Sequence, residues 1–279
     1  MQKYSFLMSV YFKEKPEYLK LSIESMINQT IKPDEIIIVK DGPLTDELDT
    51  IIDNYSADSN LFTIVALSKN RGLGNALNIG IKTSRNELIA RMDSDDISFP
   101  NRCEKLLLEF NKESELSIVG GQIVEFDGDI DKILPSRVVP CEYEKIVKFA
   151  RRRSPFNHPT VMYKKSVIEQ LGGYPSSGRK EDLDLFLLAI SNGYLVSNIS
   201  SPVLYYRSNI ENLKRRKKWS NCKEYIEIIR KYKKRGFCSF FDYFCVFLGQ
   251  ILFFITPLRL TRIINNRFLR KEVNNANAS

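Results

Sequence analysis

The chain has 279 residues, of which 43% are hydrophobic, 11% aromatic and 27% charged, a composition that excludes a wholly disordered protein. Its 13 Gly and 11 Pro residues are too few for a collagen-like or linker-rich protein, and its length fits one large domain or two closely fused halves. The formal net charge of +8 suggests a nucleic acid or an anionic membrane as partner.

The charge is distributed unevenly along the chain. Residues 214–279 contain 16 Lys and Arg against 4 Asp and Glu, a net charge of +12, whereas residues 1–213 have a net charge of −4. We therefore interpret residues 1–213 and the basic tail separately. The five cysteines show no Cys-x-x-Cys spacing and there is one histidine, so no zinc site is expected. The N-terminus does not resemble a signal peptide, which favours the reducing cytoplasm.

Apolar runs that alternate with helical patterns predict the fold class in the first part of the chain. Expected strands cover 4–11, 35–39, 62–67 and 87–92, and expected helices cover 16–29, 45–54 and 70–82. Because these strands are apolar on both faces, they predict an α/β protein with a mostly parallel sheet between helices. Further along, we expect a helix over 100–110, strand pieces over 118–126, 138–140, 156–163 and 203–207, a turn over 171–175 and a helix over 181–191.

Candidate site residues follow the ends of these strands: Tyr11, Asp41, Arg71 and the Asp93–Asp96 cluster. In parallel sheets, ligands bind beyond the carboxyl ends of the strands. We therefore expect all four to lie at one edge of the sheet. Neighbouring carboxylates repel one another, which favours a divalent cation bridging a diphosphate; the alternative is that Asp95 or Asp96 caps the next helix.

Two further segments allow both a structural and a functional interpretation. Glu181-Asp182 begins an amphipathic helix, so the pair either provides a general base or only stabilises the helix N-terminus. The Gly-containing turn at residues 70–80 could bring its backbone and Arg71 to a phosphate or a base, although it matches neither common Gly-rich phosphate fingerprint.

Taken in order, these residues resemble family 2 inverting glycosyltransferases with the GT-A fold, of the bacterial type that builds O-antigen and exopolysaccharide. The resemblance spans about residues 4–207. It rests on Ser9-Val10-Tyr11, Asp41-Gly42, Asn70-Arg71-Gly72 with Ala76-Leu77-Asn78, Asp93-Ser94-Asp95-Asp96 and Glu181-Asp182.

The resemblance implies a role for each matching position. Ser9, Tyr11, Asp41, Arg71 and Asp93 would bind the donor: Tyr11 stacks on uracil, Asp41 bonds to the base, Arg71 lies near the base or diphosphate, and Asp93 holds the ribose. Asp95 would ligate Mn²⁺ or Mg²⁺, with Asp96 as its substitute. Asp182 would be the catalytic base, with Glu181 beside it. His158, the single histidine, is either structural or lies on the acceptor side.

The implied activity is metal-dependent transfer of a hexose from a UDP-sugar to a lipid-diphosphate-linked saccharide, with inversion at the anomeric carbon. Two alternatives are a sugar-1-phosphate nucleotidyltransferase and a non-catalytic protein that binds a sugar nucleotide or a membrane. The nucleotidyltransferase is disfavoured because no Gly-rich loop follows the first strand. We expect residues 1–100 to form the nucleotide-sugar half of one GT-A domain and residues 101–213 the acceptor half.

The basic tail, residues 214–279, contains two basic runs, at 214–218 and 230–235, before an apolar aromatic segment at 237–258, and four arginines follow between 259 and 270. The apolar segment is shorter than the roughly 20 residues of a spanning helix. We therefore expect a helical tail on an anionic membrane at the cytoplasmic face of the inner membrane, and no nucleic-acid partner. The alternative is a helix packed on the catalytic body.

Overall fold

The computed structural model describes residues 2–57, 60–175, 178–208, 213–214, 216–264 and 270. Of the basic positions in the tail, Arg215, Arg267 and Lys271 lie outside the described residues. The strands are β1 (Tyr4–Val10), β2 (Glu35–Lys40), β3 (Phe62–Ala66), β4 (Leu88–Met92), β5 (Ile97–Ser98), β6 (Leu116–Asp127), β7 (Asp129–Leu134), β8 (Met162–Lys164) and β9 (Leu195–Arg207).

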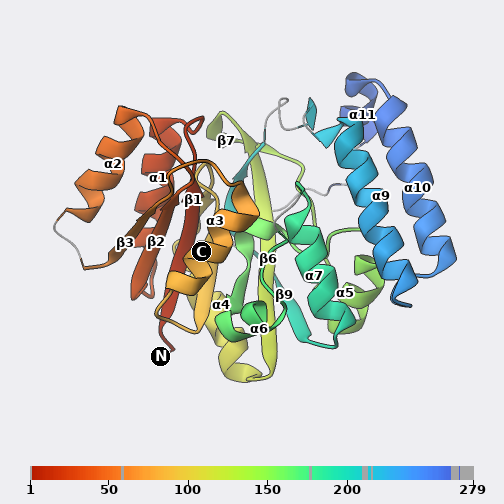
Figure 1. Cartoon of the computed structure of the whole chain (residues 1–279), viewed down its shortest axis with the longest axis horizontal. Coiled ribbons are helices and arrows are strands. Elements are labelled where there is room, and N and C mark those ends of the chain that lie inside the picture. Colours follow the sequence, from red (N-terminus) through yellow and green to blue (C-terminus); the bar gives the residue numbers. More distant parts are fainter. Residues whose placement is uncertain are drawn as a thin grey trace.

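Helices cover both faces of the sheet (Figure 1). They are α1 (Pro16–Ile27), α2 (Asp46–Ser56), α3 (Leu73–Thr83), α4 (Arg102–Lys112), α5 (Tyr143–Ala150), α6 (Lys165–Gln170), α7 (Glu181–Ser191), α9 (Trp219–Lys234), α10 (Phe240–Ile255) and α11 (Leu258–Ile264), with a 3₁₀ turn η1 (His158–Thr160).

Within the described residues, the strands form one sheet in the order β3-β2-β1-β4-β8-β6-β9-β5, with β7 paired to β6. The first four strands of this order are parallel, as expected from their apolar sequences. Beyond β4 the sheet is mixed, because β8 runs antiparallel to both β4 and β6, while β9 is parallel to β6. The fold is thus a mixed α/β arrangement, as the resemblance to GT-A enzymes leads us to expect.

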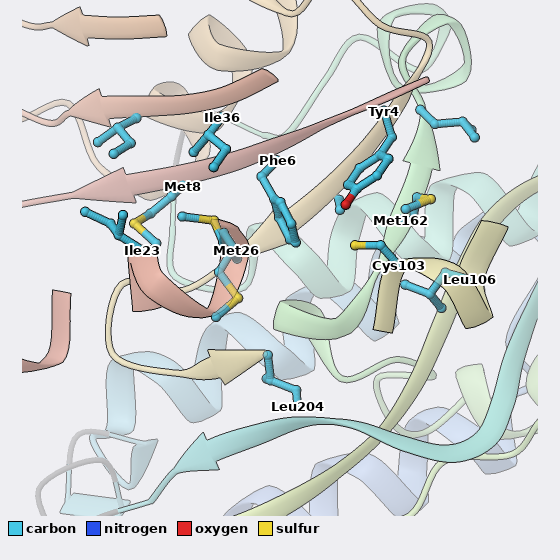
Figure 2. Close-up of a cluster of buried hydrophobic side chains, with 14 of the residues drawn as sticks. Tyr4, Phe6, Met8, Ile23, Met26, Ile36, Cys103, Leu106, Met162 and Leu204 are labelled. Atoms are coloured by element: carbon cyan, nitrogen blue, oxygen red, sulfur yellow. The ribbon is translucent and has the colours of Figure 1, made fainter. Parts of the chain in front are cut away.

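Alternate residues of each buried strand supply two cores. On β1 and β2, Phe6, Met8 and Ile36 face the core under α1, α2 and α4, whereas Leu7 and Ile37 face the core under α3, α5, α6 and α7. Figure 2 shows the first of these cores, where Met26 of α1 and Cys103 of α4 approach the side chains of β1. Burial on both faces is the physical reason why these strands carry no polar alternation.

Several sequence predictions were wrong between the two halves of the sheet. Residues 138–140 form no strand, and the expected strand over 156–163 is a 3₁₀ turn followed by the short β8. The expected strand over 203–207 is the end of the longer β9. Strands β5 and β7 and helices α5 and α6 were not predicted.

The tail folds into helices that pack on the body. Figure 1 shows α9, α10 and α11 together, at the end of the molecule opposite β3 and α2. Ile229 and Tyr232 of α9 form a small core with Leu183 and Leu187 of α7. Ser239 and Asp242 form a reciprocal cap at the start of α10, so the aspartate stabilises the N-terminus of this apolar helix. Within the described residues, no helix has the length and apolar character needed to cross a membrane.

Candidate active site

The strand register brings the predicted nucleotide-binding residues to one edge of the sheet. Val10 pairs with Lys40 and Met8 with Met92, so the chain leaves β1, β2 and β4 at neighbouring points. The backbone N–H of Asp41 donates to the carbonyl of Val10 at 2.7 Å. The predicted convergence of these strand ends is therefore confirmed.

Asp41 holds the turn that leads into α3. Its side chain is only 3% exposed, and its carboxylate accepts the backbone N–H groups of Arg71 at 2.7 Å and Gly72 at 3.0 Å. The side chain of Asn70 donates to the Asp41 carbonyl at 3.1 Å. Gly42 has a positive φ of 91°, and a Cβ there would lie 2.6 Å from the Asn70 nitrogen, so this close approach requires glycine. The turn leaves the Arg71 side chain exposed at the strand edge.

Tyr11 and Ser9 differ in accessibility. The Tyr11 side chain is 38% exposed, and its ring meets the ring of Phe12 edge to face at 6.0 Å. Ser9, two residues earlier on β1, is half-buried. Tyr11 is therefore the more accessible of the two residues at this edge of the sheet.

Three carboxylates meet after β4. Oxygen atoms of Asp93, Asp95 and Asp96 lie within 4.8 Å of one another. Asp96 is fully buried: Oδ1 accepts the backbone N–H of Arg207 at 2.8 Å, and Oδ2 has no hydrogen-bond partner among the described residues. The alternative that Asp95 or Asp96 caps the next helix is wrong, because β5 intervenes and α4 begins at Arg102.

The pKa values of two of these carboxyl groups are raised although Arg91 and Arg207 lie nearby. Burial, together with the charges of Asp93 and Glu14, raises the pKa of Asp95 to about 7. Burial and the neighbouring Asp95 raise the pKa of Asp96 well above its usual value. Three close carboxylates, one with an unpartnered buried oxygen, are the hard oxygen donors that Mg²⁺ or Mn²⁺ prefers. The residues present therefore fit a divalent cation.

The acidic pair Glu181-Asp182 forms the first turn of α7, beside the turn that Asp41 holds. A Cβ on Gly74, in the first turn of α3, would lie 3.4 Å from the Cβ of Glu181. Glu181 is buried, and its Oε2 has no hydrogen-bond partner in the described part of the chain. Burial and the adjacent Asp182 raise the pKa of Glu181 to about 7, while Asp182 itself is half-buried. A carboxyl group with this pKa can accept a proton near neutral pH.

His158 is half-buried among aromatic rings. Its Nε2 lies 2.9 Å from the hydroxyl of Tyr174, and its ring meets that of Phe186 edge to face. Burial and the charge of Arg91 lower the pKa of His158 well below its usual value, so the ring stays neutral. This arrangement accounts for a structural role of His158.

The main residue that the sequence interpretation missed is Arg91. It is fully buried on β4 and forms an ion pair with Asp93, and its charge acts on Asp96, His158 and Glu181. The available signal was an arginine inside the apolar run of β4. Arg207, which donates from Nε to the Asp95 carbonyl at 2.9 Å, was missed too.

Comparisons with known proteins agree with this geometry. The family model described as Glycosyl transferase family 2 matches residues 5–172. An Escherichia coli protein named UDP-Gal:alpha-D-GlcNAc-diphosphoundecaprenol beta-1,3-galactosyltransferase is 33% identical over 274 residues, covering 96% of this chain and 97% of that protein. Amylovoran biosynthesis glycosyltransferase AmsE of Erwinia amylovora is 34% identical, covering 87% of this chain and 91% of that protein.

A solved structure supports the fold independently of sequence. S. aureus TarS 1–349 in complex with UDP-GlcNAc superposes with a TM-score of 0.63 at 17% identity, covering 98% of this chain and 75% of that chain. The family model, the two relatives and the superposed fold agree with one another, and the chain belongs to glycosyltransferase family 2.

Proposed function

We propose that this glycosyltransferase moves a hexose from a UDP-sugar to a lipid-diphosphate-linked saccharide during synthesis of a bacterial surface polysaccharide. The E. coli relative is named for such a donor and such an acceptor, and a TarS structure was solved with UDP-GlcNAc. The observation that carries the proposal is the shared sheet edge: the three-carboxylate cluster follows β4, and the Glu181-Asp182 pair lies beside the loop held by Asp41. Membership of a glycosyltransferase family disfavours the nucleotidyltransferase alternative.

In the proposed donor complex, the uracil stacks on the exposed ring of Tyr11, with Ser9 beneath it. Each Asp41 oxygen accepts one backbone N–H and keeps a second lone pair, which is available to a base N–H. Arg71 extends from the same turn toward the diphosphate, and Asp93 contacts the ribose. Every one of these positions lies at the carboxyl end of a strand or in the loop that follows it.

Asp95 and Asp96 are the proposed ligands of Mn²⁺ or Mg²⁺. The bound cation would offset the negative charge on the departing diphosphate. Asp96 is anchored by the backbone of Arg207, which fixes one of its oxygens and leaves the other without a partner among the described residues. The unpartnered oxygen of Asp96 and the raised pKa values of Asp95 and Asp96 support a cation at this position.

Asp182 is the proposed base. Its carboxylate accepts the proton of the acceptor hydroxyl as that oxygen attacks the anomeric carbon opposite the departing UDP. The C–O bond to UDP breaks as the new one forms, so the configuration at this carbon inverts in a single displacement. Glu181 is the second candidate, because its pKa of about 7 suits proton transfer near neutral pH.

The proposed location is the cytoplasmic face of the bacterial inner membrane, where the tail lies on the anionic surface. Exposed apolar side chains line α10 and α11, among them Phe240, Leu252 and Ile263. Lys233 lies over the ring of Phe240 at 5.3 Å, so a cation accompanies this apolar surface. Apolar side chains flanked by cations are the pattern of an interfacial helix.

A transfer assay tests the function. The purified protein, with Mn²⁺ and a synthetic lipid-diphosphate-GlcNAc acceptor, is screened against UDP-hexoses, and we expect one donor to give a product with inverted anomeric configuration. Asp182→Asn should lower kcat by about 10²–10⁴-fold without changing the Kd for UDP, because only proton transfer is lost. Glu169→Gln, which alters an exposed carboxylate of α6, is the control. Retention of configuration, or full activity of Asp182→Asn, would contradict the assignment.

A further inference from the structure

The chain immediately before the proposed catalytic pair is held by the tail. The N-terminus of α7 has no side-chain cap among the described residues. Instead, Oε1 of Glu224, on α9, accepts the backbone N–H of Arg179 at 2.7 Å and that of Lys180 at 3.1 Å. These two amides directly precede Glu181, so one carboxylate oxygen fixes the entry of the chain into α7.

A glycine makes this contact feasible. Gly178 has a positive φ of 109°, and a Cβ at that position would lie 1.8 Å from Oε1 of Glu224. Any other residue would be strained in this conformation and would also displace the carboxylate. The contact therefore requires both a glycine at position 178 and a carboxylate at position 224.

A second attachment lies two turns further along α9. Lys231 Nζ contacts both carboxylate oxygens of Asp184 at 2.8 Å, and the Tyr232 hydroxyl donates to Oδ1 of Asp184 at 2.7 Å. Glu224 and Lys231 are seven residues apart and so share one face of α9. Asp184 is rotated by about 200° around α7 from Asp182. The contacts of Lys231 and Tyr232 with Asp184 therefore lie on the side of α7 away from Asp182.

Beside the apolar core that α7 and α9 share, an open pocket lies next to the loop before α7. Its volume is about 350 Å³, and Glu181, Glu224 and Lys231 are among the residues that line it. At the edge of this pocket, the backbone N–H groups of Arg179 and Lys180 are held by hydrogen bonds to Glu224.

We infer that Glu224 is a positioning residue of the transfer reaction. By holding the amides of Arg179 and Lys180, it sets where Glu181 and Asp182 lie relative to the donor. Displacement of a catalytic carboxylate by about 1 Å can cost about 10²-fold in rate. This role rests on the proposed function. It means that a helix of the tail, α9, positions the proposed catalytic pair.

The test compares three variants in the transfer assay. Glu224→Ala should lower kcat by about 10-fold or more and leave the KM for the UDP-sugar within 2-fold, because the donor site is built from other elements. Glu224→Gln should keep kcat within about 3-fold of the original, because its amide oxygen can accept the same two hydrogen bonds. Glu227→Ala is the matched control: this glutamate of α9 pairs with Lys223 at 3.8 Å and should leave kcat unchanged.

Folding is monitored by the melting temperature and by UDP binding. If Glu224→Ala does not fold, Gly178→Ala, which displaces the same carboxylate from the loop side, should give the same loss of kcat. Full kcat in Glu224→Ala, or in a folded Gly178→Ala, would contradict the positioning role of Glu224. An equal loss of kcat in Glu224→Gln and Glu224→Ala would contradict it too. None of these outcomes would contradict the proposed function. An unmodified protein that transfers no sugar would instead contradict the proposed function.

Discussion

Glu181 is buried with one carboxylate oxygen unpartnered among the described residues, and its pKa is raised from 4.5 to about 7. The folded state therefore favours the protonated form. The resulting stabilisation of the folded state is fully present below pH 4.5, the ordinary pKa of glutamate. It is lost as the pH rises to the folded-state pKa of about 7. This residue consequently links stability and the proposed chemistry to the same pH range.

Replacing Glu181 should make the protein less sensitive to pH. The free energy of unfolding of the original protein should fall between pH 5 and pH 8, and in Glu181→Gln this fall should shrink by on the order of 2 kcal/mol. Urea unfolding of both proteins at several pH values, without added metal, measures the difference. Identical pH profiles would show that Glu181 has an ordinary pKa.

The carboxylates after β4 predict a response to metal. Mn²⁺ should raise the melting temperature of the original protein, and Asp95→Asn should abolish this rise. Without metal, Asp95→Asn should itself melt at a higher temperature, because it removes repulsion among three close carboxylates. Asp131→Asn, an exposed position on β7, is the control and should leave the Mn²⁺ response unchanged. Chelation by EDTA should abolish transfer, and transfer that survives chelation would contradict the metal assignment.

At the scale of elements, prediction succeeded where burial alone determines the structure. The strands β1, β2 and β4 and the helix α7 are found close to their expected limits, because long apolar or amphipathic patterns leave few alternatives. Short β5 and β8 are set by long-range pairing with β9 and with β4 and β6, which no local pattern encodes. For the same reason the sequence placed Asp41 at the strand edge but could not reveal that its carboxylate holds the turn before α3.

The packing of α3 on the sheet gives a stability prediction. A Cβ at Gly80 would lie 2.2 Å from Leu7 Cδ1 and 3.1 Å from Val39 Cγ2, so Gly80→Ala should destabilise the protein by about 1–3 kcal/mol. Gly249, inside α10, has no atom within 4 Å of such a Cβ, so Gly249→Ala should be neutral or stabilise by up to about 1 kcal/mol. Urea unfolding of both variants checks the contrast, and equal effects would contradict it.

At the scale of the whole molecule, the net charge of +8 combines a mildly acidic body with a basic tail. The tail forms α9, α10 and α11 at one end of the molecule (Figure 1), and apolar side chains of α10 and α11 are exposed there. The charge of the whole chain alone suggests a nucleic acid, whereas its distribution, together with these exposed side chains, favours an anionic lipid surface.

Vesicle binding tests this interpretation. The protein should co-sediment with vesicles that contain anionic lipid, less with zwitterionic ones, and less at high salt. The double variant Leu252→Asp with Ile255→Asp should bind at least 10-fold more weakly, because these side chains of α10 are 58% and 63% exposed. Leu108→Asp changes a 49% exposed leucine of α4 on the body and should bind as the original does. Equal binding by all three proteins would contradict membrane attachment through α10.

The shared core of α7 and α9 has a practical consequence for protein engineering. Cutting the chain after β9 would remove Ile229 and Tyr232 and uncover Leu183 and Leu187. The shortened protein would then expose a new apolar surface on α7, the helix that begins with the proposed catalytic pair, and would tend to aggregate. A variant suited to crystallisation without detergent is therefore better obtained by replacing the exposed apolar residues of α10 with polar ones. The full length of the chain would then be kept, and with it the inner face of α9.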